Sequence, residues 1–170
     1  MYAQRNLETR DLESICLMPQ SEEELFYMSP RFVHPLTPEQ ILNIIKDRFE
    51  PTVIVVQKTD EVVAYANIYK DDSEESSFWL GNVIVSPSYR GKGAAQYLLD
   101  VMLDKAKLNL KIKEIRLACH NTNSRGLAFY SKYGFKPFDV KMTSTDAKKY
   151  ITIHMIKELH LRYEESEQFR

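Results

Sequence analysis

A segment in the middle of the chain combines backbone freedom with positive charge. In order, it reads Val83, Ile84, Val85, Ser86, Pro87, Ser88, Tyr89, Arg90, Gly91, Lys92, Gly93, Ala94, Ala95 and Gln96. The apolar run predicts a strand, and a helix is expected to begin near Gly93. The first turn of a helix carries N–H groups without intrahelical partners and attracts phosphate. Because glycine lets an anion approach these amides, and Arg90 and Lys92 add charge, the segment predicts a phosphate-binding loop.

Two better-known phosphate loops do not fit this segment. A Walker loop requires glycine five residues before its Gly-Lys pair and serine or threonine after the lysine. Here Ser86 and Gly93 occupy those positions. The dinucleotide-binding fingerprint requires a third glycine or an alanine at position 96, which is glutamine. The loop therefore belongs to another class of phosphate site.

A second pattern lies further along the chain, where residues 121–135 read NTNSRGLAFYSKYGF. The segment predicts a helix from Ser124 to Tyr133, with Gly134 at its C-terminal end. Tyr130 shares an apolar face of this helix with Leu127. Taken alone, Tyr130 is more simply interpreted as a core residue.

The two patterns together resemble the coenzyme A loop and the following helix of the GNAT superfamily of N-acetyltransferases. The matching motifs are Arg90-x-x-Gly93-x-Ala95 and Asn123-x-x-Gly126-x-x-Phe129-Tyr130-x-Lys132-x-Gly134-Phe135. Gly126 stands where the family usually has alanine, which is a mild departure. The resemblance implies acetyl-CoA (coenzyme A) as the acyl donor. It also implies an α/β fold whose mixed, mostly antiparallel sheet splays at the cofactor slot and is flanked by about four helices.

The resemblance also implies roles for individual residues. The backbone amides of Gly91, Lys92, Gly93, Ala94, Ala95 and Gln96 would cradle the pyrophosphate, with support from the side chains of Arg90 and Lys92. The strand edge formed by Val83, Ile84 and Val85 would hold the pantetheine arm. The Val85 N–H would stabilise the oxyanion that develops on the thioester. Asn123 would contact the coenzyme, and Tyr130 would protonate the leaving thiolate as a general acid.

The base that deprotonates the acceptor amine is not defined by these motifs. Many members of the superfamily carry a carboxylate on the strand before the loop, where this chain has Gly81 and Asn82. A water held by Asn82 is one alternative. His120 and His154 are others, because histidine titrates near neutrality, and so is the acidic run Glu22–Glu24. Ordinary structural or solvated side chains are the simpler interpretation of the histidines and glutamates.

The acceptor pocket is expected near residues 25–32, since the superfamily varies its first helices there. Phe26, Tyr27 and Phe32 are the candidate substrate-binding residues, and packing of the N-terminal helices is the alternative. We expect the acceptor to be a small-molecule amine or a protein amino group, and we expect no metal site. A non-catalytic acyl-CoA-binding or sensing module is the alternative function, favoured by the lack of an acid at positions 81–82.

Hydrophobic periodicity and turn residues predict the elements that must position these groups. Strands are expected near 2–7, 52–57, 62–69, 78–85, 114–119, 138–143 and 150–156, and helices from residue 9, at 21–27, 91–110 and 124–133. A further helix is predicted to open at Thr37-Pro38. Its apolar face comprises Ile41, Leu42, Ile44, Ile45 and Phe49.

The composition fits one globular domain, residues 1–170, with a charged C-terminal tail at 158–170. The 170 residues carry a net charge of -1, so nucleic acid and anionic membranes are not expected partners. Cys16 and Cys119 are too few for a disulfide framework, and the polar start is not a signal peptide, so we expect a cytoplasmic protein. If the chain forms an oligomer, we expect a homodimer.

Overall fold

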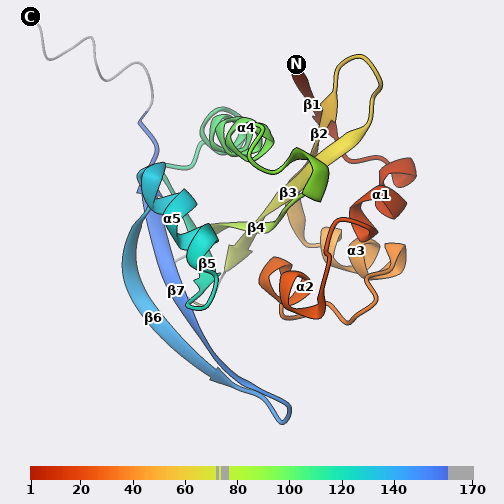
Figure 1. Cartoon of the computed structure of the whole chain (residues 1–170). Helices are drawn as coiled ribbons and strands as arrows, with labels where there is room; N and C mark the ends of the chain where they lie inside the picture. Colours follow the sequence, from red (N-terminus) through yellow and green to blue (C-terminus); the bar gives the residue numbers. More distant parts are fainter. Residues whose placement is uncertain (72, 74–76, 161–170) are drawn as a thin grey trace, which may run out of the picture. The chain divides into compact units, whose positions relative to one another are not determined.

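Four strands near the start of the chain pair in sequence order, as a computed structural model shows (Figure 1). The structure describes residues 1–71, 73 and 77–160. They form two compact units, residues 1–102 and the described residues from 103 onward. In the first unit each strand is antiparallel to the next. These strands are β1 (Tyr2–Asn6), β2 (Arg48–Val56), β3 (Val62–Asp71) and β4 (Ser77–Val85).

Three short helices lie between β1 and β2, as the sequence predicts. They are α1 (Leu12–Cys16), which follows a 3₁₀ turn at Thr9–Asp11, α2 (Glu22–Met28) and α3 (Pro38–Ile45). The Ser21 side chain caps α2 by accepting a hydrogen bond from the Glu24 N–H at 3.1 Å. The prediction that the third helix extends to Phe49 is wrong, because α3 ends at Ile45 and Phe49 lies in β2. Glu50 there has a φ of 49°, a left-handed conformation that accompanies a register shift between β2 and β3.

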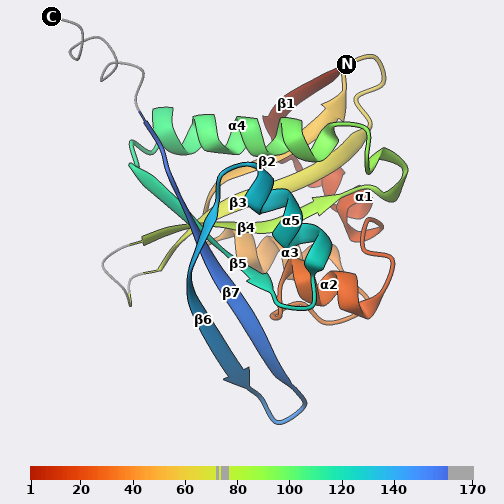
Figure 2. The ribbon, with the colours of Figure 1, turned by 60° about the vertical axis from the view of Figure 1, so that its left-hand side comes forward.

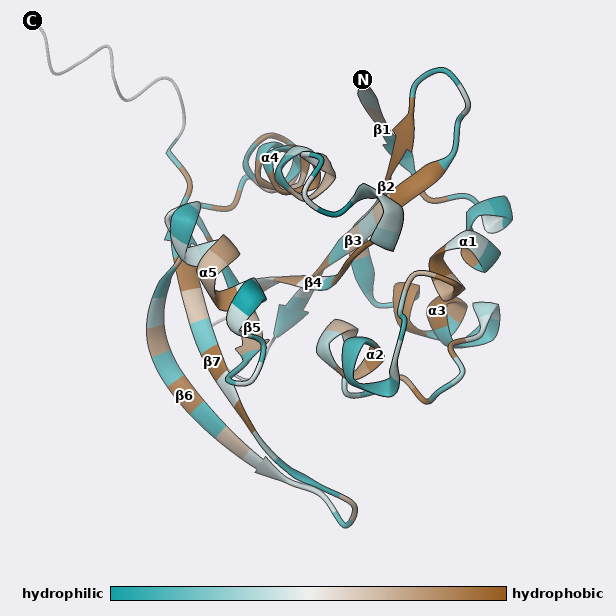
Figure 3. Cartoon of the chain, in the orientation of Figure 1, coloured by the Kyte–Doolittle hydropathy of each residue, from teal (hydrophilic) through white to brown (hydrophobic). Residues whose placement is uncertain are grey.

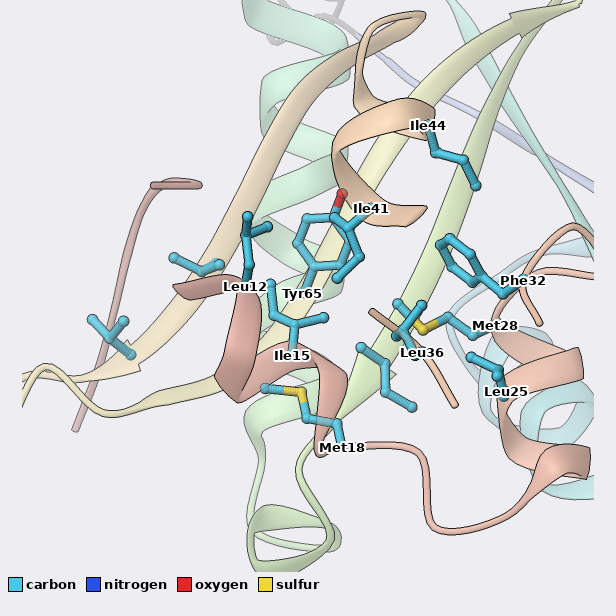
Figure 4. Packing of buried hydrophobic residues seen from close by; sticks show 13 residues of the cluster. Leu12, Ile15, Met18, Leu25, Met28, Phe32, Leu36, Ile41, Ile44 and Tyr65 are labelled. Carbon is cyan, nitrogen blue, oxygen red and sulfur yellow. The ribbon is translucent and has the colours of Figure 1, made fainter. Parts of the chain in front are cut away.

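The helices of the first unit pack against β2, β3 and β4 through one apolar cluster (Figure 4). Its members are Leu12, Ile15, Met18, Leu25, Met28, Phe32, Leu36, Ile41, Ile44, Val53, Val55, Tyr65 and Ile84. Asp11 is buried beside this cluster and accepts two hydrogen bonds from the Arg5 guanidinium, at 2.7 and 2.9 Å. The cluster fixes α1, α2 and α3 on one face of the sheet.

The second unit is built on three antiparallel strands and one helix (Figure 2). They are β5 (Glu114–His120), α5 (Ser124–Lys132), β6 (Lys136–Ser144) and β7 (Lys149–Glu158), and the strand order is β5-β7-β6. The helix α4 (Ala94–Leu108) contains the boundary between the two units. Apolar and polar residues alternate along β6, where Phe138, Val140 and Met142 are exposed (Figure 3).

The strand pairs confirm the predicted α/β class with mostly antiparallel strands. The expectation of a single domain with a charged tail stays a prediction, and residues 161–170 of that tail lie outside the described residues. Within the described part of the chain, no helix is long and apolar enough to cross a membrane.

Candidate functional site

The predicted phosphate loop joins β4 to α4 and depends on two left-handed glycines. Gly91 has a φ of 72° and Gly93 a φ of 85°, and a Cβ built on either would meet no atom within 4 Å. Glycine is therefore required here for backbone conformation rather than for space. The first helical hydrogen bond of α4 runs from the Tyr97 N–H to the Gly93 carbonyl at 3.0 Å. The amides of Ala94–Gln96 precede that bond and are the unsatisfied donors of the helix N-terminus.

Residues distant in sequence brace this loop. The Tyr2 hydroxyl on β1 donates a hydrogen bond to the Lys92 carbonyl at 3.0 Å. The Tyr89 hydroxyl donates to the Glu61 carboxylate at 2.6 Å, and the Lys92 ammonium lies 5.7 Å from the Tyr89 ring centroid. Sequence reasoning did not find Tyr2 or Glu61, because neither belongs to a local motif.

Val85, at the end of β4, has a backbone N–H that is not used by the neighbouring strand β3. The Ser86 N–H donates to the Val63 carbonyl at 2.8 Å, and Ala64 is the register partner of Val85. In an antiparallel ladder this pattern makes Ala64 and Val85 a non-hydrogen-bonded pair. The N–H and carbonyl of Val85 therefore point away from β3, as an oxyanion-binding role requires.

Arg90 connects Val85 to helix α2. Its Nε donates to the Val85 carbonyl at 3.1 Å, while Nη1 and Nη2 donate to the two carboxylate oxygens of Glu24 at 2.7 and 2.8 Å. The hydrogen bonds with Glu24 raise the pKa of Arg90. All three guanidinium nitrogens are thus engaged within the protein. A pyrophosphate contact by Arg90 requires its release from Glu24 or use of its remaining N–H groups.

Asn82 occupies a β-bulge rather than a regular strand position. Its φ is 54°, and the register of β3 with β4 shifts at this point. The buried Asn82 side chain donates to the Met28 carbonyl at 3.2 Å, and its Oδ1 accepts from Asn67 Nδ2 at 2.7 Å. Asn67 Nδ2 also donates to the Tyr65 hydroxyl at 2.8 Å, and burial raises the pKa of Tyr65 to about 12. A second lone pair of Asn82 Oδ1 remains to hold a water.

Gly81, which the sequence marks only as a position without an acid, has a packing role. A Cβ there would lie 2.9 Å from Arg48 Nη1 and 2.9 Å from a ring carbon of Tyr69. The backbone therefore approaches these side chains closely, and any side chain at position 81 would displace them. Arg48 and Asn67 beside it are further site residues that sequence reasoning missed.

The three aromatic candidates for acceptor binding differ in their surroundings. Phe32 is buried in the apolar cluster beside Met28 and Leu36 (Figure 4). Phe26 and Tyr27 lie on α2 and remain half-buried. Phe32 thus packs the N-terminal helices, which leaves Phe26 and Tyr27 as the accessible aromatic side chains of the three.

In the second unit, Tyr130 lies on helix α5 and Asn123 directly precedes this helix. Asn123 caps the helix, because its Oδ1 accepts from the Gly126 N–H at 3.0 Å. Tyr130 is half-buried, and its ring packs edge-on against Phe135 with the centroids 5.8 Å apart. Burial, followed by the nearby Cys119 thiol, raises the pKa of Tyr130. Its hydroxyl therefore keeps its proton at neutral pH and can act as a donor.

The candidate bases lie in different environments. Glu24 holds Arg90 and also accepts from the Gln20 N–H at 2.9 Å, so its carboxylate has a structural function. His120 is buried on β5 with its ring 5.4 Å from the Tyr150 ring, and the His154 ring packs 6.0 Å from Phe138. The structure thus gives each of these groups packing or ion-pair contacts within its own unit.

These features fit a phosphate-bearing coenzyme attached to a reactive carbonyl. The left-handed glycines and the free helix amides suit a pyrophosphate, which needs close backbone approach and partial positive charge. Val85 offers a backbone N–H directed away from β3. Cys119 is an unsuitable nucleophile, because burial raises its pKa to about 11.

Comparison with known proteins identifies relatives of the chain in sequence and in fold. Residues 14–135 match the acetyltransferase (GNAT) family. The chain is 35% identical over 82 residues to Protein ElaA of Escherichia coli (strain K12), a match that covers 47% of this chain and 50% of that protein. The matched part thus spans about half the length of the curated relatives.

Solved structures show the same fold. An N-acetyltransferase from Staphylococcus aureus Mu50 superposes with a TM-score of 0.75 at 15% identity, covering 94% of this chain and 99% of that one. The ribosomal-protein-S18-alanine N-acetyltransferase from Escherichia coli gives a TM-score of 0.70 at 18% identity, covering 95% and 96%.

Proposed function

The chain belongs to the acetyltransferase (GNAT) family, and on that basis we propose that it transfers an acetyl group from acetyl-CoA to a primary amine. The amine attacks the thioester directly in a ternary complex, without a covalent enzyme intermediate. The raised pKa of Cys119 supports the absence of a cysteine intermediate, because the thiolate is the nucleophilic form.

The observation that carries the proposal is the geometry of the β4–α4 connection. It combines the left-handed glycines at 91 and 93, the unsatisfied amides that open α4, and a Val85 N–H directed away from β3. The first two features suit the coenzyme pyrophosphate, and the third suits an oxyanion. Their order along the chain matches that of a donor whose phosphates and thioester lie at opposite ends of an extended arm.

Each residue then has a specific task. Acetyl-CoA supplies the activated acetyl group as a thioester. The Val85 N–H donates to the carbonyl oxygen as negative charge develops there, and Arg90 holds that backbone segment through the Val85 carbonyl. The Tyr130 hydroxyl donates a proton to the departing thiolate. Asn82 Oδ1 orients a water that relays the proton of the acceptor amine to solvent.

The proposal is tested by measuring thiol release from acetyl-CoA in the presence of a panel of amines. Tyr130→Phe is expected to lower kcat with little change in the KM for acetyl-CoA. Tyr133→Phe is the matched control, since Tyr133 is half-buried near the end of the same helix and has no assigned task. Tight coenzyme binding without turnover on any amine would refute the proposal and support the acyl-CoA-binding module instead.

A further inference from the structure

Arg48 is a half-buried cation on β2 without an anionic partner in the described part of the chain. Its guanidinium carbon lies 4.4 Å from the centroid of the Tyr69 ring, and Tyr69 is the residue of β3 that pairs with Arg48. Its hydrogen bond, from Nη1 to Asn67 Oδ1, is 3.5 Å long. Arg48 forms no ion pair with any of the described residues.

The charges around Arg48 leave its own charge poorly compensated. Burial lowers the pKa of Arg48, and this is the largest effect. Tyr69 and Tyr65 raise the pKa, Arg31 lowers it and Asp47 raises it, in decreasing order. A guanidinium nonetheless stays protonated in proteins, and it has five N–H donors. Buried charges are normally paired, because an unpaired charge removed from water is costly. Among the residues that the structure describes, no carboxylate forms an ion pair with Arg48, and a planar carboxylate fits a guanidinium through two parallel hydrogen bonds.

The surroundings hold Arg48 in a fixed orientation. The Asn67 amide cannot flip without losing its bonds from Nδ2 to Asn82 and Tyr65, so its Oδ1 faces Arg48. Tyr69, beneath the guanidinium, stacks on Trp79 with ring centroids 6.1 Å apart and an interplanar angle of 17°. A binding group that is ordered before its ligand arrives loses less entropy on binding.

We propose that Arg48 binds a carboxylate of the acceptor, so that the acceptor is a small amine carrying a carboxylate, as an amino acid does. This inference rests on the proposed acetyltransfer. Asn67 connects the two parts of the acceptor site, because one end of its amide contacts Arg48 and the other contacts Asn82. The Asn67 side chain therefore lies between the proposed anion site and Asn82, whose proposed task is to orient the water that takes up the proton of the amine. Arg31 contributes further positive charge from the loop after α2.

The test uses as acceptors each amino acid found in proteins and, separately, the carboxamide derivative of the same amino acid. The rate of thiol release is measured at saturating acetyl-CoA. We expect the wild type to favour the carboxylate member of at least one pair by tenfold or more in kcat/KM. Arg48→Gln should remove that preference by lowering kcat/KM for the carboxylate member alone. Arg48→Lys keeps the positive charge but loses the planar guanidinium that binds a carboxylate through two hydrogen bonds. Its preference for the carboxylate should therefore lie between those of the wild type and Arg48→Gln. Arg10→Gln, which removes an exposed guanidinium, should leave the preference unchanged.

Three outcomes would overturn the inference while leaving acetyltransfer intact. They are no carboxylate preference in the wild type, equal losses on both members of a pair in Arg48→Gln, and a thermally unfolded Arg48→Gln. A folded Arg48→Gln is expected, because the change removes a half-buried charge that forms no ion pair with the described residues, and glutamine can keep a hydrogen bond to Asn67 Oδ1.

A wild type that acetylates no amine would refute the proposed function instead. The fluorescence of Trp79, the single tryptophan of the chain, then decides the inference, since Trp79 stacks beneath Arg48 through Tyr69. With CoA present, a saturable response to an amino acid in the wild type that is lost in Arg48→Gln would support it. No response in the wild type would overturn it.

Discussion

The ion pair between Glu24 and Arg90 should stabilise the first unit measurably. It joins helix α2 to the end of β4 through two charge-assisted hydrogen bonds of 2.7 and 2.8 Å. Glu24→Gln and Arg90→Gln each remove one charge and leave the other half-buried. Arg90→Gln also removes the hydrogen bond to the Val85 carbonyl. We expect each variant to lower the free energy of unfolding.

The magnitude follows from the geometry and the exposure of the pair. A hydrogen bond to a charged group contributes about 1.5–3 kcal/mol, while a fully exposed ion pair contributes about 0–1 kcal/mol. The side chains are 25% and 29% exposed, which places this pair between the two limits. We therefore expect a coupling energy of about 1.5 kcal/mol between Glu24 and Arg90.

Urea unfolding of the wild type, the two single variants and the double variant gives this coupling energy directly. The Asp104–Lys107 pair of α4, with its charged atoms 3.6 Å apart and Asp104 67% exposed, is the control, and its coupling should be about 0.2–0.5 kcal/mol. A Glu24–Arg90 coupling no larger than that of the control would refute the reasoning. In that case Arg90 would be free to leave Glu24 for the coenzyme.

Three further predictions concern the loop, the acid and the thiols. Gly93→Ala should cost about 1–2 kcal/mol of unfolding free energy, because a φ of 85° is unfavourable for alanine although no atom lies within 4 Å. Gly93→Asn should cost less in the same denaturant assay, and equal losses would contradict a purely conformational cause. Tyr130→Phe should lower kcat roughly 100-fold. The raised pKa of Tyr130 means that the wild-type rate should not decline through its ionisation below pH 10, and a decline abolished by Tyr130→Phe would contradict this. Cys16 and Cys119, whose pKa values burial raises from 9.0 to about 11, should react with iodoacetamide at pH 8 roughly 100-fold more slowly than an unperturbed thiol, as followed by mass spectrometry. Rapid alkylation in the folded protein would contradict the burial of these thiols.

The sequence predicted the glycine loop, and helix α5 with Gly134 at its C-terminal end, because both depend on local residue types. The positive φ angles at 91, 93 and 134 favour glycine. Such requirements act over a few residues, so they are visible in the linear pattern. Both motifs lie within residues 14–135, which match the acetyltransferase (GNAT) family.

Arg48 was missed because a helix was predicted to continue through Phe49. Pro51 disfavours helical conformation at the residue before it, a signal that could have ended the helix earlier. Even a correct strand assignment would not have found the proposed anion site. The proposal depends on the absence of an ion pair between Arg48 and the residues that the structure describes, and this is decided by how three strands pack together.

The amino-acid sequence by itself thus predicted a phosphate loop, since such a loop needs backbone conformations that only certain residues adopt, and the resemblance to the GNAT superfamily implied the donor. The tertiary structure decided which side chains come together at the proposed acceptor site. Glu24 and Arg90 are 66 residues apart, and the Arg48–Asn67–Gly81 cluster draws on β2, β3 and β4. These contacts depend on strand register and on a bulge at Asn82, which arise from packing of the whole unit rather than from any local pattern.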